Sequence, residues 1–188
     1  MAIGFSPLRG VEPGQDRSMS NRLKTLSVEY SQAEDRLRFR ARSTNDTEFQ
    51  FWITRRIVNM MWGSLLVALE KSLGADGQST EARKAMLSMH HRGAVEARKF
   101  AHAKKHKQAN EKPVPLATVV KIGNRENGSV QLTFVTDAKK EYGLKLPEDS
   151  VHALCHLIQS ATKKAKWGLD LEIGDESVIA PPPTSKVH

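Results

Sequence analysis

Apolar and polar residues alternate along two stretches of the chain, and each stretch ends in a segment of helical periodicity. In residues 26–53 the apolar residues recur at every second position, which is typical of half-buried antiparallel strands. From Ile57 to Leu69 the spacing changes to three and four residues, as on one side of a helix. A second stretch, from about Leu116 to Ala161, repeats this order. The pattern predicts an α+β fold built from two strand–strand–strand–helix units.

The two units coincide when the chain is shifted by 93 residues, with no gap. Under this shift the apolar residues of three segments fall on apolar residues of the second unit: Leu37 and Phe39 on Val130 and Leu132; Phe49, Phe51 and Ile53 on Tyr142, Leu144 and Leu146; Val58, Met61, Leu65 and Ala68 on Val151, Leu154, Ile158 and Ala161. We therefore predict two βββα repeats, each an antiparallel sheet with a packed helix, related by pseudo-twofold symmetry and joined by a long basic connector helix.

The helix ends carry local signals. Thr54 is a candidate N-cap and Gly74 a candidate C-terminal residue of the first helix. Pro147 suits the start of the second helix. The first helix is apolar almost all round. We expect it to pack on its own sheet and to meet the second unit's helix, or alternatively to form a homodimer through Met60–Leu69.

The segment between the units favours a helix from Ser79 or Thr80 to about Asn110, because Ala, Lys, Arg and Glu dominate it. Its apolar residues Met86, Met89, Val95 and Phe100 form a narrow stripe, so we expect an exposed connector that touches the body on one side. A short strand is expected at 169–173. The predicted organisation is a flexible N-terminus (1–20), the first repeat (21–74), the connector (75–112), the second repeat (113–173) and a disordered Pro-rich tail (174–188).

The net charge of +8 is concentrated in the connector. Residues 79–112 contain 9 basic and 3 acidic residues, whereas residues 113–188 contain 9 of each. A concentrated positive field attracts phosphate backbones or acidic partners. The connector residues expected to grip phosphates are Arg98, Lys99, Lys104, Lys105 and Lys107. A plain soluble linker helix is the alternative.

The second strand of the first unit carries a stripe of four arginines on the side opposite Leu37 and Phe39. Alternate residues of a strand are about 6.6 Å apart, comparable to the phosphate spacing of an extended single strand. Trp52 points to the same side from the next strand, and arginine beside an exposed aromatic ring suits single-stranded nucleic acid. The alternatives are arginines paired with glutamates, or a face covered by the connector. The stripe is Arg36, Arg38, Arg40 and Arg42, and its possible partners are Glu29, Glu34 and Glu48.

Histidine and cysteine residues give weaker signals. His102 and His106, four residues apart, could share a helix face, but no ligand set with metal spacing accompanies them or His90–His91. Cys155 lies beside His152 and His156, and we interpret it as a packing residue rather than a nucleophile. Arg55–Arg56 opposes the dipole of the first helix, a placement tolerable in solvent or useful for an anion. No metal, cofactor or catalytic residue is predicted.

The broad class follows from what the sequence lacks. A single cysteine excludes an intrachain disulfide and favours a reducing compartment, so we expect a cytoplasmic protein. The first 20 residues have no apolar core for a signal peptide, and no stretch is apolar enough to span a membrane. Nucleotide-binding and hydrolase motifs are absent.

The order of elements in residues 26–73 and 116–166 resembles the duplicated sheet-and-helix units of the Whirly and Pur-repeat nucleic-acid-binding proteins. This is a resemblance of architecture, since no sequence motif of these families is present. Three hypotheses follow: a non-catalytic protein that binds DNA or RNA, a protein-interaction or scaffolding module that can dimerise, and an enzyme on a different fold.

Overall fold

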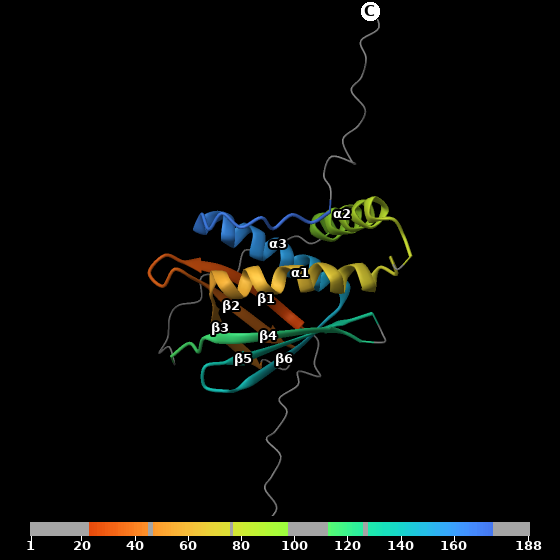
Figure 1. The fold of residues 1–188 in the computed structure, drawn as a ribbon. Helices are drawn as coiled ribbons and strands as arrows, with labels where there is room; N and C mark the ends of the chain where they lie inside the picture. Colours follow the sequence, from red (N-terminus) through yellow and green to blue (C-terminus); the bar gives the residue numbers. More distant parts are fainter. Residues whose placement is uncertain (1–22, 45–46, 76, 98–112, 126–127, 175–188) are drawn as a thin grey trace, which may run out of the picture.

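The computed structural model describes residues 23–44, 47–75, 77–97, 113–125 and 128–174. The predicted α+β class is confirmed, because two three-stranded antiparallel sheets are combined with three helices (Figure 1). In chain order the elements are β1 (Leu23–Ser31), β2 (Arg36–Ser43), β3 (Glu48–Ile53), α1 (Arg55–Ser72), α2 (Thr80–Ala97), β4 (Ala117–Asn124), β5 (Val130–Thr136), β6 (Glu141–Leu146) and α3 (Glu148–Ala165).

Each sheet has its strands in chain order, β1-β2-β3 and β4-β5-β6. The registers of β2–β3 and β5–β6 match the 93-residue shift, since Phe39 pairs with Phe51 and Leu132 pairs with Leu144. The first strands do not match it. Phe39 pairs with Val28, whereas Leu132 pairs with Ile122 rather than Lys121. The gap-free alignment is therefore wrong by one residue before the first hairpin, and the pseudo-twofold relation in space stays a prediction.

The inner faces of the two sheets share one hydrophobic core. The ring of Phe51 stacks on that of Phe39, with centroids 4.8 Å apart, and lies 4.5 Å from that of Phe134 in the other sheet. All three side chains are fully buried. Strands β3 and β4 also meet at one point, where the Trp52 amide donates to the Pro115 carbonyl at 2.8 Å. The two units are therefore packed as one body.

The helices dock on the sheets in an exchanged arrangement. Helix α1 lies along β4 of the second sheet, and α3 lies along β1 of the first (Figure 1). The Asn124 amide donates to the Ala68 carbonyl at 2.8 Å and ties β4 to α1. The prediction that α1 meets the other unit's helix is confirmed, but its main strand contact is not with its own sheet. Because only Thr54 separates β3 from α1, the helix starts at the edge where β3 adjoins β4 and crosses to β4.

The predicted caps are present at both ends of α1. The Thr54 side chain accepts a hydrogen bond from the Ile57 amide at 3.3 Å, and Gly74 follows the helix with φ +64°. Pro147 is the N-cap residue of α3, and two acidic residues in the first turn complement the helix dipole. No helix in the described ranges has the length and apolar character needed to cross a bilayer.

Helix α2 differs from the predicted connector in its packing. Its fully buried apolar residue is Leu87, whereas Met89, which the pattern placed on the stripe, is 65% exposed. The predicted continuation from Arg98 to Asn110 lies outside the described residues, as do residues 1–20 and the tail from 175 onward. The prediction of a short strand at 169–173 is wrong. This segment is extended without strand pairing, because α2 and α3 bind its carbonyl groups through side chains instead.

Candidate nucleic-acid interface

Arginine side chains line the outer face of the first sheet, opposite the core. Residues of β2 alternate between buried and half-buried, so that Leu37, Phe39 and Ala41 face inward and the arginines face outward. The pairing register places the neighbouring outward residues of β3 beside the arginines, as the sequence predicted. This arginine face comprises Arg36, Arg38, Arg40, Arg42, Glu48, Gln50 and Trp52.

The arginine face is held in place by contacts between neighbouring strands. The Gln50 carbonyl oxygen Oε1 accepts hydrogen bonds from Arg38 Nη2 at 3.0 Å and from Arg40 Nε at 3.1 Å. The Arg38 guanidinium also lies 5.7 Å from the centre of the Trp52 ring, a cation–π geometry. These contacts hold Arg38 and Arg40 at Gln50 and place Arg38 over the half-buried Trp52 ring.

Ion pairs are present at the two ends of the arginine face. Arg42 Nε lies 3.6 Å from a Glu48 carboxylate oxygen, and Arg36 Nη1 lies 3.5 Å from one of Glu34. Pairs this exposed contribute only about 0.2–1 kcal/mol each, so a phosphate can compete for these arginines. The alternative of arginines paired with glutamates is therefore correct for Arg36 and Arg42.

The outer face of the second sheet lacks an equivalent stripe. Gln131, Thr133 and Val135 occupy the outward positions of β5, and the Lys121 ammonium on β4 pairs with Glu141 at 3.2 Å. The two sheets therefore present different surfaces, one rich in arginine and one close to neutral.

Several sequence-predicted residues fall outside this interface. Arg98, Lys99, Lys104, Lys105 and Lys107 lie outside the described residues, as do His102 and His106. Arg55 and Arg56 are exposed at the start of α1 and are not part of the arginine face.

A histidine pair joins α2 to α3, and the sequence analysis did not predict it. His91 Nδ1 lies 3.3 Å from His152 Nδ1, and the His152 side chain is fully buried. Burial, together with a smaller effect of the nearby imidazoles, lowers the pKa of each histidine to about 4. Both rings are therefore neutral at pH 7, and one ring donates a hydrogen bond to the other. A signal was present in the sequence, because His152 follows Val151 in the apolar part of the helix.

The described part of the chain shows no metal centre or reactive thiol. No three His, Cys, Asp or Glu side chains within it are grouped so that they could hold a metal ion. Cys155 is fully buried, and burial raises the pKa of its thiol to about 12, so the reactive thiolate is scarce at neutral pH. The interpretation of Cys155 as a packing residue agrees with this burial.

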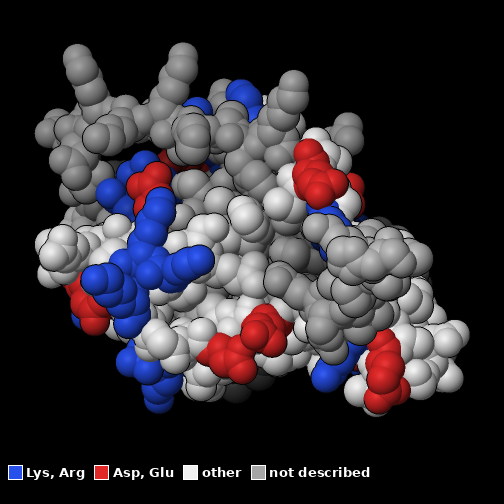
Figure 2. All heavy atoms as spheres, turned by 90° about the horizontal axis from the view of Figure 1, so that it is seen from above, with Lys and Arg blue, Asp and Glu red and all other residues white. Residues whose placement is uncertain are grey.

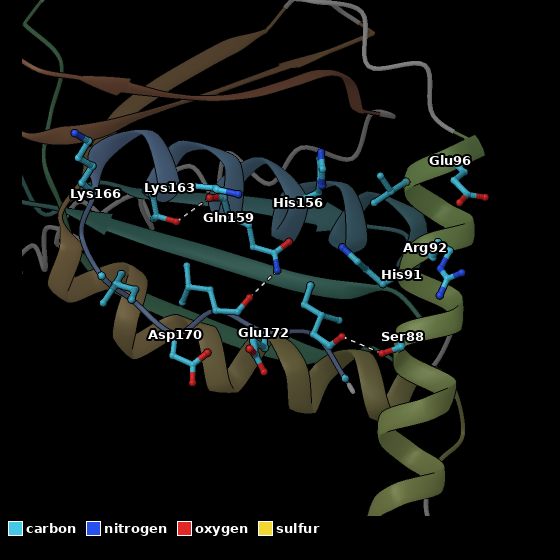
Figure 3. Close-up of a pocket in the computed structure, with 17 residues that line it drawn as sticks. Ser88, His91, Arg92, Glu96, His156, Gln159, Lys163, Lys166, Asp170 and Glu172 are labelled. Carbon is cyan, nitrogen blue, oxygen red and sulfur yellow. Dashed lines mark hydrogen bonds between the residues drawn. The ribbon is translucent and has the colours of Figure 1, made fainter. Parts of the chain in front are cut away.

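An open groove of about 1300 Å³ lies between α2, α3 and the segment after α3. His91 and Arg92 border it from α2, and His156 and Lys163 border it from α3 (Figure 3). Its floor is fixed by two hydrogen bonds to backbone carbonyls, from Ser88 Oγ to Ile173 and from Gln159 Nε2 to Leu171.

These features define the class of protein as an α+β protein of two interlocked three-stranded sheets with one arginine-rich outer face. Comparison of the chain with protein-family models, curated proteins and solved structures gave no match. The resemblance to Whirly and Pur-repeat proteins therefore remains one of element order, and the functional argument depends on the chain's own residues.

Proposed function

We propose that the protein is a non-catalytic nucleic-acid-binding protein that holds single-stranded DNA or RNA on the arginine face. The observation that carries the proposal is the register that sets Arg38 and Arg40 beside Trp52 and Gln50. A strand spacing of about 6.6 Å between alternate residues suits the backbone of an extended single strand. Trp52 supplies an aromatic surface on which a base can stack, worth about 1–3 kcal/mol.

The stacking and phosphate contacts expected on the arginine face should allow different bases to bind. Stacking and phosphate contacts carry little sequence information, because every base has a π-face and every nucleotide a phosphate. The amide of Gln50 is the one neutral hydrogen-bonding side chain between Arg38 and Arg40. We expect only a modest base preference to arise from it.

Labelled oligonucleotides in a salt series test the proposal. We expect a 20-nucleotide single strand to bind at 50 mM salt, with affinity that falls steeply as salt rises because counterions are released. Arg38→Glu combined with Arg40→Glu should abolish this binding, and Trp52→Ala should weaken it about 10-fold or more. The control for position is Gln131→Glu combined with Thr133→Glu, which places glutamates at the equivalent outward positions of the second sheet and changes the net charge by half as much. An Arg38/Arg40 variant that binds like the wild type would refute the role of the face.

A protein-interaction module is the second candidate function. It is favoured by Met60 and Val67, which are 64% and 51% exposed on the outer side of α1. A homodimer through this helix would cover both residues. Light scattering after size-exclusion chromatography distinguishes the two, since Met60→Glu should dissociate such a dimer. A stable monomer at high concentration argues against it.

A further inference from the structure

Two basic helix ends lie next to each other at one end of the helical layer. The first turn of α1 carries Arg55 and Arg56, and the last turn of α3 carries Lys163 and Lys164, with Lys166 just beyond it. The start of α1 and the end of α3 lie at the same end of the molecule (Figure 1). Figure 2 shows several Lys and Arg side chains at this end of the surface, with acidic side chains next to them. We refer to these five residues as the cationic end.

Asp35 connects the two helix ends. The Trp167 indole donates a hydrogen bond to the Asp35 carboxylate at 3.0 Å, and Tyr30 donates another at 2.9 Å. These hydrogen bonds, with a smaller contribution from the positive charge of Arg55, lower the pKa of Asp35. The carboxylate is therefore ionised, but both of its hydrogen bonds come from neutral groups.

Local structure explains only part of this charge. The lysines at the C-terminus of α3 are favoured by the helix dipole, whereas the arginines at the N-terminus of α1 are opposed by it. The first turn of α1 contains no acidic residue that could compensate. Tertiary packing then brings the lysines to the same end as the arginines, which adds like-charge repulsion. The helix dipole and the like-charge repulsion both make this placement of the basic residues unfavourable for folding. Their placement therefore indicates that they serve the binding of a partner.

The cationic end also differs from the arginine face in its pairing. Within the described ranges, none of its five side chains forms an ion pair or a side-chain hydrogen bond, whereas Arg36 and Arg42 are paired with glutamates. A phosphate that binds at the cationic end displaces no ion pair or side-chain hydrogen bond of these residues, so the gain in affinity for each contact is larger there.

We propose that the cationic end grips the phosphate backbone of the same single strand whose bases lie on the arginine face. This inference rests on the proposed function. The two surfaces are linked along the chain, because Arg36 begins the arginine face immediately after Asp35. The partner must be a flexible polyanion, since it has to bend around the hairpin between β1 and β2. A rigid duplex is expected to bind less tightly.

Charge neutralisation in the full chain tests the proposal, with a fluorescein-labelled 20-nucleotide oligo(dT) as the probe. The test variant combines Arg56→Gln, Lys163→Gln and Lys164→Gln. It should weaken binding at least about 10-fold and lower the slope of log affinity against log salt by about 2, since each lost single-strand contact accounts for about 0.7. The control variant combines Lys121→Gln, Lys140→Gln and Lys145→Gln on the second unit, removes the same charge, and should change the slope by less than half as much.

The outcomes separate the two proposals. Wild-type binding that persists in the test variant, with an unchanged slope, overturns the role of the cationic end and leaves the arginine face standing. Equal losses in test and control variants also overturn it, because net charge alone would explain them. No binding by the wild-type protein at 50 mM salt overturns the proposed function and this inference together. Circular dichroism of each variant confirms that the fold is retained, and these exposed substitutions should leave it intact.

Discussion

Substitution of Phe51 tests the conclusion that the two sheets form one core. Its ring is fully buried between Phe39 of its own sheet and Phe134 of the other, with the latter centroid 4.5 Å away. Phe51→Ala should destabilise the protein by about 3–5 kcal/mol through lost burial and the cavity left behind. For a chain of this size, that corresponds to a melting temperature lower by about 6–20 °C.

The contact between the sheets can be measured separately from burial. A double-mutant cycle with Phe51→Leu and Phe134→Leu should give a coupling free energy of about 0.5–1.5 kcal/mol, as expected for an aromatic pair in contact. Met60→Ala is the control for substitution in general. Because that side chain is 64% exposed, it should change the free energy of unfolding by less than about 0.5 kcal/mol.

Urea unfolding followed by circular dichroism and by tryptophan fluorescence provides the assay. Circular dichroism reports on the helices and strands, and fluorescence reports on the packing around Trp52, Trp62 and Trp167, so coincident transitions would show that both units unfold together. Two separated transitions, or a coupling free energy within about 0.3 kcal/mol of zero, would refute the shared core.

Two further predictions concern the contacts of α2. In the native state the pKa of His152 is about 4, whereas in the unfolded chain it is about 6.5, so unfolding takes up a proton between these values and stability falls as pH decreases from 6.5 to 4. At pH 5 the free energy of unfolding should be lower by about 2 kcal/mol because of this group. Urea midpoints measured from pH 7.5 to 4.5 should decline less steeply in the double variant His91→Gln/His152→Gln than in the wild type. An equal decline of the midpoint with pH in both proteins would refute the buried pair. Gly174→Ala should destabilise the protein by more than 1 kcal/mol, because φ is +73° and the added methyl group would collide with Ser88. Gly168→Ala, at φ +60° with open space around it, should cost about 1 kcal/mol, and equal melting temperatures for the two variants would contradict the collision.

The sequence predicted the local structure of both units well. Alternation of apolar residues identified the strands, and the cap at Thr54 identified the start of α1. The outward direction of Arg38 and Arg40 followed from the same alternation. These features depend on residues close together in the chain, and their periods are set by backbone geometry.

The failures of prediction involve contacts between distant segments. The one-residue offset of β4 was missed because hairpin length, rather than apolar pattern, sets the register there. The expected strand at 169–173 has alternating residues but no partner strand, since Ser88 and Gln159 bind its carbonyl groups. Met89 was assigned to the buried side of α2, although the periodicity of a weak stripe does not fix its orientation.

The sequence by itself determined the strands and helices of the two repeats, which side of these elements faces the core, and that four arginines share one sheet face. Tertiary structure alone decided that α1 crosses to β4 and α3 to β1, that His91 meets His152, and that Arg55 and Arg56 lie at the same end of the molecule as Lys163 and Lys164. The reason is physical. Periodicity acts over a few residues, whereas these contacts join segments far apart in the chain, such as Ala68 with Asn124 and His91 with His152, and depend on how the two sheets share one core.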